Sequence, residues 1–175
     1  SVFDTVLIVA RVANGFQNRA NESTRVDNAD VEVLPLPHYI GPYQYLKKKN
    51  RLNRALKWYI DSYPDTAVIC RVPGAIGAAA AKYLASRHRP YGVEVVGDPL
   101  DVFAPGSFSH PLRPVFRHML ARNLKTVVKE AAAAIYVTKT SLQKRYPSAE
   151  KRFSTYASNV MLPPDAFVRV AKRLK

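Results

Sequence analysis

The sequence is poor in cysteine and in long apolar runs. Its one cysteine, Cys70, cannot form an internal disulfide, and it lies in the apolar run of residues 67–70. Burial in the core is the common environment of a free cysteine, with a nucleophilic thiol as the alternative. No run approaches the roughly 18 apolar residues that span a bilayer, and the first residues lack the basic-then-apolar order of a signal peptide. These absences predict a cytoplasmic protein without a disulfide framework.

Metal and dinucleotide motifs are also missing. The chain has no Asp-x-Asp pair, no cysteine and histidine ligand set and no Gly-x-Gly-x-x-Gly turn. None of the four histidines has a catalytic partner at a suitable spacing: His38, His88, His110 and His118. We therefore expect no metal site and no bound cofactor, and the sequence identifies no catalytic residue.

Acidic residues are few beside the basic ones. Asp and Glu number 13 against 27 Lys and Arg, which leaves a formal net charge of +14. Such an excess favours a polyanionic partner, whether a nucleic acid, an anionic lipid surface or a phosphorylated small molecule. At 175 residues the chain fits one domain. We expect that domain to span residues 1–167, followed by a basic tail or linker at 168–175.

What the sequence does contain is an alternation of apolar, β-branched runs with helical segments. Strands are predicted at residues 5–12, 31–36, 67–72, 91–96 and 133–138. Helices are predicted at residues 45–63, 76–88, 111–134 and 141–146, and a polar loop at residues 14–30. This alternation is typical of an α/β fold, here a Rossmann-like, three-layer domain with a mostly parallel sheet. Because no helix follows strand 5–12, we expect a first strand and its glycine-rich turn to be missing.

The predicted helix at residues 45–63 is amphipathic. Leu52 and Leu56 recur at helical spacing on one face, while Arg51 and Arg54 follow the opposite face. A basic outer face of this kind suits an anionic membrane surface, and an ordinary solvated helix face is the alternative.

Two candidate binding residues follow the third predicted strand. Ligands of open parallel sheets bind beyond the carboxyl ends of the strands, where Arg71 and Gly74 stand. The helix that begins after Gly74 would present backbone N–H groups to an anion, and Arg71 would add a fork of donors. The alternative is a plain strand-to-helix turn with Arg71 paired to a neighbouring carboxylate.

Carboxylates gather at the end of the fourth predicted strand. Glu94 lies within the strand and needs a partner such as Arg71 or a hydroxyl, because an unpaired buried carboxylate is costly. Asp98 follows Gly97 at the strand exit, where it would either bind a substrate hydroxyl or start a turn with Pro99.

Hydroxyl groups and a lysine follow the fifth predicted strand. Thr138 and Lys139 come just before a predicted helix, whose amino-terminal cap we assign to Thr140 or Ser141. Lys139 would meet a phosphate group there. The carboxyl ends of parallel strands meet at one edge, so these residues are expected to lie near those after the third and fourth strands.

Several ordered runs carry a resemblance to a known enzyme family. They are residues 3–12 (FDTVLIVARV), 71–74 (RVPG), 91–99 (YGVEVVGDP), 136–138 (YVT) and 142–147 (LQKRYP). Together they resemble the N-terminal domain of retaining glycosyltransferases with the GT-B fold, of the group 1 or family 4 type. The likeness extends over residues 3–167.

The resemblance implies an enzyme with two Rossmann-like domains that face each other across a cleft. In that family the N-terminal domain mainly receives the acceptor, and the C-terminal domain holds the nucleotide sugar and a pair of Glu residues separated by seven. This chain would then be an acceptor-binding half, inactive alone, that serves sugar transfer to a hydroxyl acceptor in glycan or glycolipid biosynthesis. Family members with lipid-linked or phosphorylated acceptors contact the membrane peripherally through basic helices, which implies the inner face of the membrane here.

Together with the strand ends, the resemblance gives the predicted substrate-binding residues. Asp98 stands where many relatives place a histidine or an acidic group near the transferred sugar, but this chain has Gly97-Asp98 in place of the common histidine. No catalytic role is therefore assigned to Asp98. The predicted set is Arg71, Gly74, Glu94, Asp98, Thr138 and Lys139.

Two functions of other classes compete with the enzyme interpretation. A nucleic-acid-binding module is suggested by the net charge and by basic and aromatic residues, Trp58 among them, on one helix. A noncatalytic interaction domain is the other alternative. No recognised nucleic-acid-binding motif is present, and the carboxylates gather where a ligand would sit, so nucleic acid is the less favoured partner.

Overall fold

The structure is a computed structural model that describes residues 3–13, 29–102 and 113–158. The chain divides into two compact units, Ser1–Thr66 and Ala67–Lys175. The predicted tail at 168–175, most of the predicted polar loop at 14–30 and His110 lie outside the described residues. The predicted domain limits therefore stay a prediction.

The first unit consists of two parallel strands and one long helix. Strand β1 (Val6–Val12) pairs with β2 (Val31–Pro37) from Val6 opposite Val31 to Val12 opposite Pro37. Helix α1 (Gly41–Ser62) packs on β2, and the Tyr59 hydroxyl donates to the carbonyl of Pro35 at 3.1 Å. Leu34 and Leu36 of β2 and Leu52, Leu56 and Ile60 of α1 are buried. The apolar stripe of α1 therefore forms the core of this unit.

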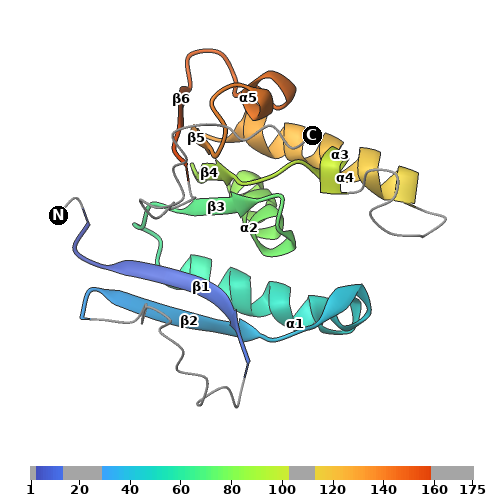
Figure 1. Cartoon of the computed structure of the whole chain (residues 1–175). Helices are drawn as coiled ribbons and strands as arrows, with labels where there is room; N and C mark the ends of the chain where they lie inside the picture. The colour runs from blue at the N-terminus through green and yellow to red at the C-terminus, as the bar shows by residue number, and fades with distance from the viewer. Residues whose placement is uncertain (1–2, 14–28, 103–112, 159–175) are drawn as a thin grey trace, which may run out of the picture. The chain divides into compact units, whose positions relative to one another are not determined.

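The second unit is a four-stranded parallel sheet with helices between its strands (Figure 1). The strand order is β3 (Ile69–Val72), β4 (Gly92–Val95), β5 (Ala133–Tyr136) and β6 (Phe153–Tyr156). The helices are α2 (Ala75–Ser86), α3 (Pro99–Val102), α4 (Arg113–Glu130) and α5 (Ser141–Arg145). Helix α2 packs on β3 and against α4.

One face of the four-stranded sheet forms the core of the second unit. Along β3, β4 and β5 every second residue is buried and lies on this face, and Leu84 of α2 and Val128 of α4 are buried as well. Cys70 belongs to this face, and burial raises the pKa of its thiol to about 12. The buried strand residues are Cys70, Val72, Val93, Val95, Ala134 and Tyr136. The core interpretation of Cys70 is therefore confirmed, and its thiol stays protonated at neutral pH.

The predicted fold class is confirmed, because the described strands are all parallel and alternate with helices after β2. Four details differ. The strands form two sheets where one was expected, and the predicted helix at 111–134 ends at Glu130 because Ala133 and Ala134 pair with β4. Strand β6 and helix α3 were not predicted.

Candidate functional site

The four strands of the second unit all end at the same register position. Val72, Val95, Tyr136 and Tyr156 are register partners across the sheet. The ladder continues one residue further, with Val96 N–H donating to Val72 O at 2.9 Å and Val137 N–H to Val95 O at 3.2 Å. We call the last residues of β3 and β4 and the residues that follow β3, β4 and β5, namely 71–77, 94–101 and 137–146, the carboxyl edge. Ligands of parallel α/β sheets bind at such an edge.

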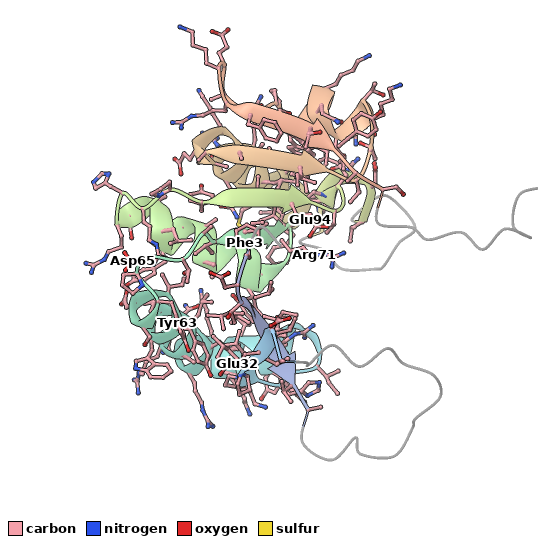
Figure 2. All side chains as sticks on the ribbon, turned by 90° about the vertical axis from the view of Figure 1, so that its left-hand side faces the viewer. Phe3, Glu32, Tyr63, Asp65, Arg71 and Glu94 are labelled. Atoms are coloured by element: carbon pink, nitrogen blue, oxygen red, sulfur yellow. The ribbon has the colours of Figure 1, made fainter. Side chains whose placement is uncertain are left out.

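Arg71 and Glu94 face each other on adjacent strands of this edge. They are register partners, and Arg71 Nε lies 3.5 Å from a carboxylate oxygen of Glu94; Figure 2 shows the two side chains together. The predicted pairing of Glu94 with Arg71 is confirmed. The Arg71 side chain is 63% exposed and that of Glu94 is 28% exposed. The guanidinium is thus oriented by a carboxylate and still open to a ligand from solvent.

Gly74 is the residue from which helix α2 begins. Its carbonyl accepts the N–H of Ala78 at 2.9 Å, and no side chain caps the helix. The first turn of α2 lies directly on the backbone of β3, since a Cβ atom on Gly77 would come 2.0 Å from Arg71 O. Gly77 was not predicted as important, although a lone glycine within an alanine-rich helix often marks such a close approach.

Asp98 is buried at the carboxyl edge and accepts hydrogen bonds from three groups. One carboxylate oxygen accepts the Leu100 N–H at 2.7 Å and the Tyr146 hydroxyl at 2.5 Å. The other accepts a hydrogen bond from Arg145 Nη1, which also donates to exposed Asp101 at 3.2 Å. Asp98 therefore joins the β4 exit to the end of α5, and contact with a substrate hydroxyl stays a prediction.

Sequence reasoning did not assign Tyr146 and Arg145 to the site. Tyr146 is buried, and its carbonyl accepts the hydroxyl of buried Tyr136 at 2.7 Å. Burial and the hydrogen bond to Asp98 raise the pKa of the Tyr146 hydroxyl, so it remains a donor across the physiological range. The only sequence signal was the run at 142–147, which gave no indication of its partner.

The protonation of Asp98 follows from these contacts. Burial alone would raise the pKa of Asp98, but hydrogen bonds from Tyr146, the Leu100 N–H and Arg145 outweigh burial and hold the pKa below its ordinary value. The carboxylate is therefore charged at neutral pH, and the folded state binds its proton less readily than the unfolded state does.

This difference predicts an acid-dependent loss of stability. Below the unfolded-state pKa of about 3.9, the unfolded chain takes up a proton at Asp98 before the folded chain does, so the free energy of unfolding falls as the pH falls. Urea unfolding of the wild type and of Asp98→Asn, followed from about pH 6 to about pH 3, measures the effect. We expect the free energies of unfolding of the two proteins to converge as the pH falls. If the difference between them stayed constant with pH, Asp98 would have no depressed pKa.

Thr138 supports helix α5. Its Oγ1 accepts the N–H of Leu142 at 3.1 Å, and its carbonyl accepts a hydrogen bond from the Gln143 side chain at 2.6 Å. The helix has its amino-terminal cap position at Thr140, one of the two predicted residues, but Thr140 makes no side-chain cap hydrogen bond, and the Thr138 hydroxyl accepts the N–H of Leu142 instead.

Lys139 is exposed beside the end of β6. Its Nζ lies 5.9 Å from the centre of the Tyr156 ring. At the carboxyl edge, Arg71 and Glu94 form an ion pair, and Gly74 lies at the start of helix α2, which follows β3. Thr138 and Lys139 follow β5, two strands away from β3 in the sheet order.

The described residues hold neither a candidate metal site nor a candidate membrane-spanning helix. Within residues 3–13, 29–102 and 113–158, no group of three or more His, Cys, Asp or Glu residues is arranged to hold a metal ion. Over the same residues, no helix is both long and apolar enough to cross a membrane.

The fold and the carboxyl edge define a parallel α/β protein with a charged strand-end surface. No protein-family model matches the chain. Among curated proteins, the chain is similar to Protein CapJ of Staphylococcus aureus, with 30% identity over 154 residues that cover 87% of this chain and 38% of CapJ. The chain therefore spans well under half the length of this relative.

Among solved structures, the chain is similar to a UGT transferase from Siraitia grosvenorii crystallised in complex with UDP. The TM-score is 0.49 at 10% identity, and the match covers 88% of this chain and 44% of that chain.

Proposed function

We propose that the chain forms the acceptor-binding part of a retaining, family 4 type glycosyltransferase with the GT-B fold, which moves a sugar from a nucleotide sugar to a hydroxyl acceptor. The nucleotide sugar would bind chiefly through a second domain outside this sequence, and the chain alone would be inactive. The acceptor would be lipid-linked or phosphorylated, as in glycan or glycolipid biosynthesis, and the location would be cytoplasmic.

The observation that carries this proposal is the carboxyl edge of the second unit. Four parallel strands end level there, and the edge bears an exposed guanidinium oriented by Glu94, with exposed Lys139 two strands away. Cationic groups on a strand-end surface suit a phosphorylated acceptor. The resemblance of residues 71–74, 91–99 and 136–138 to the acceptor-side domain falls on the same edge.

The test is a transfer assay on the full-length protein that contains this chain, in which release of nucleoside diphosphate is followed with a panel of nucleotide sugars. Arg71→Gln and Lys139→Gln are expected to raise the acceptor KM by roughly tenfold each, from the loss of one charge-assisted hydrogen bond. The donor KM should not change, because these residues are assigned to the acceptor.

The matched control is Arg87→Gln. Arg87 is an exposed arginine at the opposite end of helix α2, away from the carboxyl edge. It loses the same charge, so it should leave both KM values at wild-type levels. Absence of transfer with every nucleotide sugar contradicts the enzyme assignment, and a raised donor KM in Arg71→Gln contradicts the acceptor role of the edge.

A further inference from the structure

The loop that joins β2 to α1 holds two basic side chains through its carbonyl groups. Arg11, near the end of β1, donates from Nη1 to the carbonyl of Tyr39 at 3.1 Å. Lys48 of α1 donates from Nζ to the carbonyl of His38 at 2.6 Å. Both cations are therefore ordered at the end of the first unit where the two strands finish and α1 begins (Figure 1).

Aromatic rings fix the guanidinium of Arg11 from a second side. The guanidinium lies over the ring of Tyr39, 4.3 Å from the ring centre. The Tyr39 ring in turn packs against that of Tyr45 in α1, with centres 5.2 Å apart. Arg11 is exposed, and its hydrogen bond to Tyr39 uses one of the five N–H groups of a guanidinium. The side chain is thus held in place with donors left for a ligand.

Within residues 3–13 and 29–66, the acceptors of Arg11 and Lys48 are neutral carbonyl oxygens, not carboxylates. In the second unit, by contrast, Arg71 is paired with Glu94. The carboxylates of the described first unit lie at the opposite ends of its elements: Asp4, Asp30 and Glu32 at the starts of the strands, and Asp61 and Asp65 in and after the last turn of α1. The two ordered cations therefore form a positive end without a balancing charge, which attracts an anion.

The groups beside these cations are polar. Gln44 is exposed, and its Oε1 accepts a backbone N–H of the loop at 2.9 Å, which leaves the amide NH2 as a donor. Gln44 and Lys48 are four residues apart and so are neighbours on α1. Tyr39 and Tyr45 are half-buried and in contact with each other, so at this cluster a nucleotide base has no exposed ring to stack on. Donors for an anion and for hydroxyl groups together favour a charged saccharide.

We propose that this end of the first unit binds an anionic saccharide. The β2–α1 site, as we call it, consists of Arg11, Tyr39, Gln44, Tyr45 and Lys48. Arg11 and Lys48 bind the carboxylate or phosphate group of the saccharide, and the amide of Gln44 donates to one of its hydroxyl groups. Tyr39 is a positioning residue, because it acts on the ligand through the guanidinium that lies over its ring.

The inference goes beyond the proposed function. It concerns residues of the first unit and equilibrium binding in the absence of a sugar donor. A protein that binds anionic saccharides and transfers no sugar, or the converse, separates the two proposals.

The first test is a calorimetric titration of the full-length protein that contains this chain. The probes are trigalacturonate, its neutral counterpart galactotriose, glucose 6-phosphate and inorganic phosphate. We expect trigalacturonate to bind at least about tenfold more tightly than galactotriose, which lacks the charged group. Tighter binding of glucose 6-phosphate than of trigalacturonate would support the site and identify phosphate as its anionic group. Inorganic phosphate bound as tightly as glucose 6-phosphate would contradict recognition of a saccharide.

Variants then locate the binding. Arg11→Gln with Lys48→Gln removes two charge-assisted hydrogen bonds and should weaken trigalacturonate binding roughly 100-fold, with galactotriose unaffected. The matched control is Arg152→Gln with Lys125→Gln, which removes the same charges from exposed positions of the second unit. The control should bind trigalacturonate as the wild type does.

Two substitutions at Tyr39 test its positioning role. Tyr39→Phe keeps a ring under the guanidinium and should bind within about twofold of the wild type, whereas Tyr39→Leu should bind roughly fivefold more weakly. Urea unfolding of both variants separates affinity from stability. If Tyr39→Leu lowered stability alone and kept the wild-type affinity, Tyr39 would have no positioning role.

Three further results would overturn the proposal. The first is equal affinity for trigalacturonate and galactotriose. The second is an equal loss of affinity in the Arg11 and Lys48 variant and in its control. The third is binding of UDP that the Arg11 and Lys48 substitutions weaken as much as they weaken trigalacturonate binding, which would assign the cluster to a nucleotide.

Discussion

A Gly77→Ala variant is expected to lose about 3 kcal/mol of stability, against the usual direction of this substitution. In an ordinary helix position alanine is more stable than glycine by up to roughly 1 kcal/mol. At Gly77 the added Cβ would come 2.0 Å from the Arg71 carbonyl oxygen and 2.7 Å from its carbon. These are backbone atoms of a strand, so they cannot rotate away, and α2 must move off the sheet.

Gly97→Ala is the control for this prediction. An added Cβ at Gly97 meets nothing within 4 Å. The same chemical change should therefore alter the free energy of unfolding by no more than about 0.5 kcal/mol. Urea unfolding of the two variants and the wild type measures both values. If Gly77→Ala were as stable as Gly97→Ala, the close approach of α2 to β3 would be wrong.

Asp98→Ala is expected to cost about 3 kcal/mol as well, but for an electrostatic reason. The variant leaves the buried Tyr146 hydroxyl and the Leu100 N–H without their acceptor. A buried donor without an acceptor loses its hydrogen bond to water and makes none within the protein, which destabilises the folded state. The end of α5 should also loosen from the β4 exit, which amide hydrogen exchange at residues 141–146 would detect.

Asp101→Ala is the matched control, because both carboxylates accept from the same Arg145 guanidinium. Asp101 differs in exposure, with a side chain 75% exposed against 3% for Asp98. An exposed ion pair contributes little, so its loss should change stability by less than about 1 kcal/mol. Equal effects of the two substitutions would mean that burial of Asp98 does not govern this network.

The fold class could be predicted because its signals are local. Each of the first five strands is an apolar run with turn residues near it, and each such run reappears as β1 to β5. Strand β6 (Phe153–Tyr156) gives no such signal, since it lies at the sheet edge and three of its four side chains are exposed. It is defined by pairing with β5, which no local pattern records.

The same limit applies to the site. The pairing of Arg71 with Glu94 was predictable, because a carboxylate within a strand needs a partner and a basic residue lies near the end of the adjacent strand. The partner of Asp98 was not, because Tyr146 lies 48 residues further along the chain. The position of Gly77 on β3 also depends on how closely a helix packs, which composition does not give.

The exposed position of Trp58 has a practical consequence for measuring folding. Tryptophan emission belongs to the first unit, and the chromophore is already largely in water before unfolding. The tyrosines that change environment most are Tyr91, Tyr136 and Tyr146, all buried in the second unit. Tyrosine absorbance therefore reports mainly on the second unit, whereas Trp58 emission changes little when the first unit unfolds. Unfolding of the first unit is better followed by amide hydrogen exchange in α1, and its comparison with the tyrosine transition shows whether the units unfold as one cooperative body or in sequence.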